Sequence, residues 1–170
     1  MKKIILILAF IGMITLQSCT VNDTAANVDN DTIAEVFELR NINFGNDGGN
    51  NYSIYQTFSP QIYPSDVVLI YRLSGTIDSS TPIWQQIPRT LFLLEGELDY
   101  DFDFSKEDFT IYAGGTYDLS LTPTYINNET FRIVIVPGYL SNKGMKVDTS
   151  DYNATIKAFN IDDSKIKELK

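Results

Sequence analysis

The chain has 170 residues, with 13 basic and 22 acidic side chains and a formal charge of −9 at pH 7. Nucleic-acid binding needs basic side chains gathered on one face, so this balance excludes DNA and RNA as expected partners. The sequence has no histidine and one cysteine, which excludes a Ser-His-Asp triad, a Cys-His dyad, a histidine zinc site and an internal disulfide. It also lacks a glycine-rich phosphate loop, so we expect no nucleotide, flavin or nicotinamide cofactor.

The first 19 residues have the pattern of a secretory signal that ends in a lipobox. A basic start is followed by an apolar run at residues 4–16 and by the sequence Leu16-Gln17-Ser18-Cys19. The run is shorter than the roughly 20 apolar residues of a transmembrane helix. We therefore predict that residues 1–18 are a signal peptide and that Cys19 is the lipidated first residue of the mature protein. The alternative is an ordinary signal peptide with an incidental cysteine.

The predicted anchor determines how the mature chain would meet a membrane. Signal removal takes away two lysines and leaves 11 basic and 22 acidic side chains, a formal charge of −11. Such a body does not adhere to anionic lipid head groups, so several acyl chains on Cys19 must supply the membrane contact. Residues 19–32 are polar, with almost nothing to bury, and are predicted to form a flexible tether.

Residues 33–170 have the pattern of one β-rich domain. Short apolar or alternating runs are separated by Gly, Pro and Asn turns, which is typical of sandwich-like antiparallel sheets. We expect turn-rich loops at residues 43–51 and 75–82, and a break at Gly114-Gly115. The predicted strands cover residues 34–44, 52–58, 67–73, 83–87, 90–94, 97–104, 109–112 and 131–136.

The clearest pattern lies at residues 97–104, where Leu98, Tyr100, Phe102 and Phe104 alternate with four acids. Period two predicts a strand with one buried aromatic face and one solvated acidic face.

One short helix is expected near the C-terminus, at about residues 149–159. Asp148 is its predicted N-cap, and Tyr152, Ile156 and Phe159 follow at helical spacing. The charged tail at residues 161–170 is expected to fray.

Two resemblances concern the cell envelope. Residues 83–88, 98–104, 131–138 and 151–154 are similar to a group of small uncharacterised lipoproteins and collagen-like surface proteins from Bacteroidetes-type bacteria. This resemblance covers roughly residues 83–161. It implies export to a Gram-negative envelope, with the anchor in the outer membrane, and it supplies no catalytic residues. Asp23-Thr24-Ala25 and Asp31-Thr32-Ile33 resemble O-glycosylation acceptors of such bacteria, so Thr24 and Thr32 are candidate modification sites.

Asp99, Asp101 and Asp103 are the main candidate metal ligands, and three interpretations stay open. Calcium needs several oxygens around one point, but acids two apart on a strand project in parallel, about 6–7 Å apart. An EF-hand would need glycine and glutamate where Phe104 and Thr110 stand. The other interpretations are a pair of acids for sugar hydrolysis and a solvated strand face that discourages edge pairing.

Two further patterns could serve a small ligand. The loop at residues 43–51 could hold an ion or ligand through Asp47 and asparagine amides, although such loops usually only turn the chain. Aromatic side chains could form a sugar-stacking platform or belong to the core; these are Trp84, Tyr52, Tyr55, Tyr63 and Tyr71.

We expect a non-catalytic envelope lipoprotein that contacts an unknown protein or surface polymer. The alternative is a module that binds carbohydrate or calcium.

Overall fold

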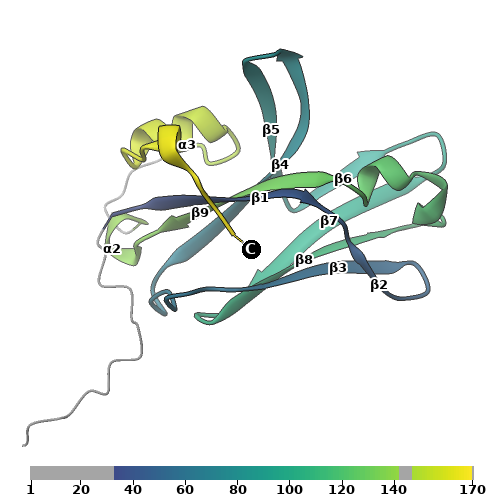
Figure 1. The fold of residues 1–170 in the computed structure, drawn as a ribbon, viewed down its shortest axis with the longest axis horizontal. Helices are drawn as coiled ribbons and strands as arrows, with labels where there is room; N and C mark the ends of the chain where they lie inside the picture. The colour runs from purple at the N-terminus through teal and green to yellow at the C-terminus, as the bar shows by residue number, and fades with distance from the viewer. Residues whose placement is uncertain (1–32, 142–146, 170) are drawn as a thin grey trace, which may run out of the picture.

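The computed structural model describes residues 33–141 and 147–169. The predicted signal peptide, Cys19, the tether, Thr24 and Thr32 all lie outside these residues. The described chain is mainly β, with two sheets in a sandwich and a short helix near the C-terminus, which confirms the predicted fold class (Figure 1). Within it, every helix falls short of the length and apolar character that crossing a bilayer requires.

The first sheet is built around a strand that is buried on both faces. Its five strands, in spatial order, are β10 (Lys167–Glu168), β1 (Glu35–Ile42), β9 (Glu129–Val136), β4 (Val67–Asp78) and β5 (Thr81–Ile87). The central strand β9 is rich in β-branched residues, as a strand covered on both sides requires. All neighbours pair antiparallel except β10, which runs parallel to β1.

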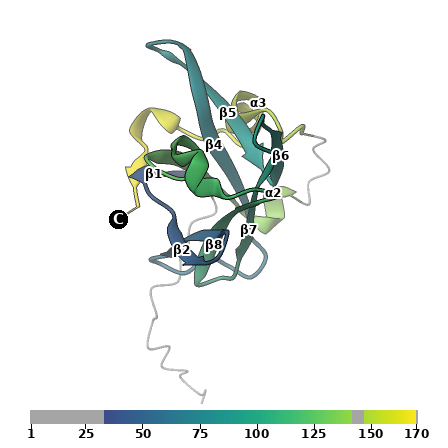
Figure 2. The same cartoon turned by 90° about the vertical axis from the view of Figure 1, so that its right-hand side faces the viewer.

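The hairpin of β4 and β5 is longer than the sequence predicted. Residues 75–82 were expected to form a loop, but β4 continues to Asp78 and β5 begins at Thr81. The Asp78 carboxylate closes the turn, because it accepts hydrogen bonds from the Ser80 N–H at 2.8 Å and the Thr81 hydroxyl at 3.0 Å. The hairpin projects from the body of the sandwich in both views (Figures 1 and 2).

The prediction of a frayed tail was also wrong in part. Lys167 and Glu168 form β10, opposite Phe37 and Glu38 of β1. The Leu169 N–H donates to the Glu38 carbonyl at 3.0 Å. Backbone hydrogen bonds therefore attach this charged segment to β1, although its side-chain pattern did not predict a strand.

The second sheet is wholly antiparallel. Its five strands, in spatial order, are β2 (Gly45–Gly48), β3 (Asn51–Thr57), β8 (Asp108–Gly115), β7 (Glu97–Phe104) and β6 (Arg89–Phe92). The expected loop at residues 43–51 thus contains a short strand, β2. The expected break at Gly114-Gly115 was wrong, since both glycines pair within β8. Gly115 is needed there because a Cβ would lie 2.5 Å from the Glu97 carbonyl oxygen.

The main core lies between the two sheets. Leu98 and Tyr100 of β7 are buried in it, as the alternation predicted. Phe102 is only half-buried and Phe104 is 43% exposed, so the predicted aromatic face is only partly buried. Phe104 is the last residue of β7, beside the turn to β8, and its ring stacks on Phe102 at 6.3 Å between ring centroids.

The helix α3 (Tyr152–Ala158) covers the outer face of the first sheet (Figure 1). Its N-cap is Asp151, whose carboxylate accepts from the Ala154 N–H at 3.2 Å. The predicted cap, Asp148, instead accepts from the Ser150 N–H at 3.0 Å and closes the preceding turn. The remaining short helices were not predicted; they are α2 (Gly138–Ser141), η1 (Leu119–Leu121), η2 (Pro123–Tyr125) and η3 (Asp163–Lys165).

Candidate functional site

The outer face of the second sheet is open, and most of its side chains are acidic or hydroxylated. Along β7, Glu97, Asp99, Asp101 and Asp103 are all exposed, while Leu98 and Tyr100 between them are buried. The register places side chains of β3, β6 and β8 beside these acids. We call this surface the acidic face; it comprises Tyr55, Thr90, Phe92, Glu97, Asp99, Asp101, Asp103, Asp108 and Tyr112.

No basic side chain interrupts the acidic face. The five strands of the second sheet contain one basic residue, Arg89. Arg89 stands directly opposite the buried Tyr100 and therefore belongs to the inner side of the sheet edge. The carboxylates of β7 consequently have no neutralising partner on their own face among the described residues.

Tyrosine hydroxyl groups hold two carboxylates of the acidic face. The Tyr112 hydroxyl donates to Asp103 Oδ2 at 2.9 Å, and the Tyr55 hydroxyl donates to Asp108 Oδ2 at 3.1 Å. These hydrogen bonds are the main reason that the pKa of each phenol is raised. Both phenols stay neutral donors at neutral pH, so the face combines ordered negative charge with two tyrosine rings.

The three candidate metal ligands are not brought together. Asp99 accepts from the Thr90 hydroxyl at 2.5 Å, and Asp101 accepts from the Phe102 N–H at 2.8 Å. Asp103 is bound to Tyr112 on the neighbouring strand. Residues 33–141 and 147–169 contain no cluster of three or more His, Cys, Asp or Glu side chains that could hold a metal ion. The three carboxylates stand in a row along one strand, which is the arrangement of a solvated face.

The outer face of the first sheet has the opposite character, because Arg132 organises a partly buried network there. Arg132 Nε donates to Glu38 Oε2 at 3.1 Å, and Nη1 donates to the Tyr152 hydroxyl at 2.6 Å. The guanidinium also lies over the Trp84 ring, 4.3 Å from its centroid. Tyr152 in turn donates to Asp163 Oδ2 at 3.1 Å. The network ties β1, β9, β5, α3 and η3 together.

A second buried charge pair lies inside the sandwich. Arg72 Nε and Nη2 donate to the two carboxylate oxygens of Glu129 at 2.6 and 2.9 Å, and both side chains are almost fully buried. Tyr100 packs against the guanidinium, with its ring centroid 4.8 Å away. Burial raises the pKa of Tyr100 far above its ordinary value. These groups are all partnered, so we interpret them as part of the core.

The aromatic residues that were considered for a sugar platform lie in separate places. Tyr52 is buried in the main core, and Tyr71 is buried beneath α3. Trp84 packs on Tyr152, with ring centroids 5.6 Å apart, while Tyr55 lies on the acidic face. Tyr63 is half-buried before β4. These side chains therefore do not form one stacking surface.

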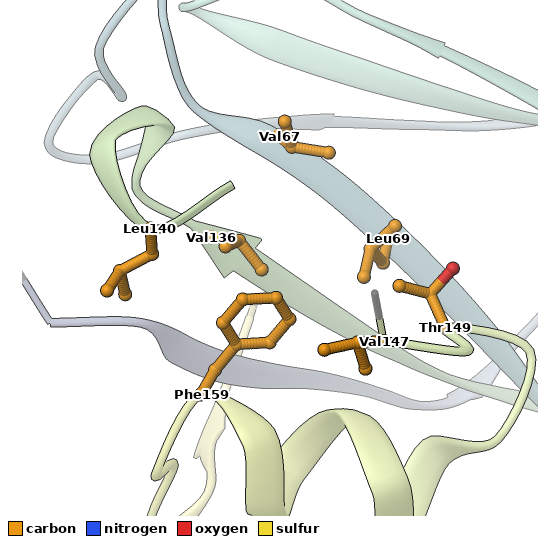
Figure 3. Close-up of a pocket in the computed structure, with 7 residues that line it drawn as sticks. All are labelled: Val67, Leu69, Val136, Leu140, Val147, Thr149 and Phe159. Carbon is orange, nitrogen blue, oxygen red and sulfur yellow. The ribbon is translucent and has the colours of Figure 1, made fainter. Parts of the chain in front are cut away.

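An apolar pocket of about 140 Å³ lies beside α3, on the outer face of the first sheet (Figure 3). Phe159 and Leu140 face Val136 and Leu69 across it, and Thr149 supplies the single hydroxyl of the lining. A pocket of this size can hold one small apolar group. It offers no pair of acid and base side chains, so it does not support an active site. Its lining is Val67, Leu69, Val136, Leu140, Val147, Thr149 and Phe159.

Sequence reasoning found the acids of the acidic face but missed the residues around them. The contact of Tyr112 with Asp103 could not be predicted, since it depends on the register between β7 and β8. Arg132 was seen only as part of an apolar strand. A basic residue within such a strand is a usable signal, because a buried charge needs a partner.

Comparison with protein-family models, with curated proteins and with solved structures finds no match to this chain.

Proposed function

We propose that the chain is an exported lipoprotein, anchored in the outer membrane of a Gram-negative envelope by lipid on Cys19. Its β-sandwich is a non-catalytic interaction module at the end of a polar tether. The lipobox, the polar composition of residues 19–32 and the absence of histidine support this proposal. Thr24 and Thr32 are proposed sugar acceptors within the tether.

The partner is a basic protein surface in the envelope, and it binds the acidic face. The observation that carries this proposal is the uninterrupted row of Glu97, Asp99, Asp101 and Asp103 on an uncovered sheet face. Complementary charge steers association and suppresses wrong partners. Tyr55 and Tyr112 add rigid aromatic area, the kind of side chain that contributes most to protein interfaces.

Capture of partners with the lipidated protein tests the partner assignment. Full-length protein is purified from envelopes in mild detergent, as wild type and as the triple variant D99N/D101N/D103N. We expect a stoichiometric basic protein with the wild type and its loss with the variant. A control variant, E35Q/D78N/E168Q, removes the same charge from the first sheet, away from the acidic face, and should retain the partner.

Two results would contradict the partner assignment. Equal recovery by all three proteins would show that the acidic face is not the contact. Binding that survives protease treatment of the envelope extract would indicate a surface polymer in place of a protein.

Metabolic labelling with palmitate tests the anchor. We expect label in the wild type, none in Cys19→Ser, and release of the variant from the membrane fraction. Unchanged fractionation of the variant would contradict the anchor. The intact mass of the mature protein tests Thr24 and Thr32, and a mass without added sugar would reject their modification.

A further inference from the structure

One edge of the first sheet differs from the other three sheet edges of the described chain. The outer strands β10, β2 and β6 have two, four and four residues, whereas β5 has seven. Natural proteins protect sheet edges by keeping the edge strand short or by placing charges on it. The β5 sequence, Thr-Pro-Ile-Trp-Gln-Gln-Ile, contains no charge, and its proline stands at the second position. Residues 83–87 therefore form an uncharged stretch on the longest outer strand of the described sheets.

The outer edge of β5 has no strand beside it in the described chain. In the described chain β5 pairs only with β4, and its hairpin projects away from the two layers (Figures 1 and 2). The residues from Ile83 to Gln86 are half-buried or exposed. An unpaired edge carries a row of backbone N–H and C=O groups, and an extended peptide can bind to these groups as an added strand.

A polar hollow of about 400 Å³ lies along this edge. Residues 84–89 form one wall of it, and Ser150 approaches from the turn before α3. The Gln85 side chain makes no hydrogen bond with any residue that the structure describes, and Gln86 reaches the Thr149 hydroxyl only at 3.5 Å. The hollow thus offers amide groups to a polar side chain of an incoming peptide.

Arg89 makes the hollow favourable for a negatively charged group of a ligand. The sequence has four arginines, and three of them form ion pairs: Arg40 and Arg132 with Glu38, and Arg72 with Glu129. The Arg89 side chain lines the hollow and makes no ion pair or hydrogen bond within the described part of the chain. A guanidinium that has no ion pair among the described residues of so acidic a protein is complementary to a carboxylate of a ligand.

We propose that the free edge of β5 is a second binding site, which takes an extended peptide segment carrying a carboxylate. The peptide adds as a strand beside residues 83–87, and Arg89 holds its acidic side chain or its C-terminus. This site is separate from the acidic face and selects the opposite charge, so it does not rest on the proposed function.

The test uses a displayed library of random heptapeptides selected against the full-length protein. Trp84 is the only tryptophan in the chain and lines the hollow, so its fluorescence reports binding of each selected synthetic peptide. We expect the selected peptides to be rich in β-branched residues, with an acid at a fixed position. Arg89→Gln should weaken their binding about tenfold, the loss of one charge-assisted hydrogen bond, whereas Arg40→Gln should leave it unchanged.

Two neighbouring proline variants separate edge pairing from simple charge attraction. Successive residues of a strand direct their N–H groups to opposite edges, so Gln85→Pro and Gln86→Pro block different edges. One variant should unfold because it loses a bond to β4. The other should keep its melting temperature and lose the peptide. Peptides that bind this folded variant, or Arg89→Gln, as tightly as wild type would overturn the proposal. Self-association through β5 with no peptide selected would assign the edge to a second copy and overturn it as well.

Discussion

The outer faces of the two sheets carry similar pairs of groups in different surroundings. On the first sheet the Tyr152 hydroxyl donates to Asp163 under α3, while on the second sheet the Tyr112 hydroxyl donates to Asp103 in solvent. Tyr152 is buried and also contacts Tyr71, Trp84 and Arg132; Tyr112 is 39% exposed. Burial therefore makes the first pair part of the packed structure, whereas the second pair stays exposed to solvent.

Truncating the two tyrosines should give the largest difference. Tyr152→Ala empties a packed site and should reduce the free energy of unfolding by about 4 kcal/mol, as for other large buried aromatics. Tyr112→Ala removes an exposed ring and should reduce it by less than about 1 kcal/mol. Urea unfolding followed by circular dichroism measures both. Similar losses would show that the acidic face also supports the fold.

The two arginines that share Glu38 should differ by a smaller amount. Arg132→Met leaves Glu38 buried without its main interior partner and should reduce the free energy of unfolding by about 3 kcal/mol. Arg40→Met removes a guanidinium that is 58% exposed and should change stability by about 1 kcal/mol at most. Equal effects in urea unfolding would contradict the structural role of the network.

Alkaline pH should lower the free energy of unfolding more through Tyr152 than through Tyr112. Burial is the main reason that the pKa of Tyr152 lies above its ordinary value. Above about pH 10 the unfolded chain releases this proton while the folded chain retains it, so stability falls as the pH rises. Tyr152→Phe should reduce that slope by about 1 kcal/mol per pH unit, and Tyr112→Phe by clearly less. The measurement is urea unfolding between pH 9 and 11.5, and equal slopes for the two variants would count against this account.

Calcium should have the smallest effect. A ligand that binds only the folded state raises the melting temperature. Because Asp99, Asp101 and Asp103 stand in a row with separate donors, millimolar calcium should shift the melting temperature by less than about 1 °C. A larger shift that disappears in D99N/D101N/D103N would instead support the calcium-binding alternative.

Of the two outer sheet faces, only that of the second sheet was predicted from the sequence. Alternation in β7 identified the acidic face, because period two separates buried from solvated positions without knowledge of the neighbours. The network of Arg132 could not be predicted, since its partners Glu38 and Asp163 are distant in sequence. The length of the β4–β5 hairpin was missed because Gly75 and Ser74 suggest a turn several residues too early. Lys167 and Glu168 pair with β1 through backbone hydrogen bonds, and their side chains have no pattern that predicts a strand.

The most direct test of the central claim measures stability and partner binding on the same variant. We predict that D99N/D101N/D103N unfolds within about 0.5 kcal/mol of the wild type, since these side chains are exposed, and yet fails to capture the basic envelope partner. A variant that unfolds several kcal/mol more easily, or that retains the partner at the wild-type level, would contradict the assignment of the acidic face as the interaction surface.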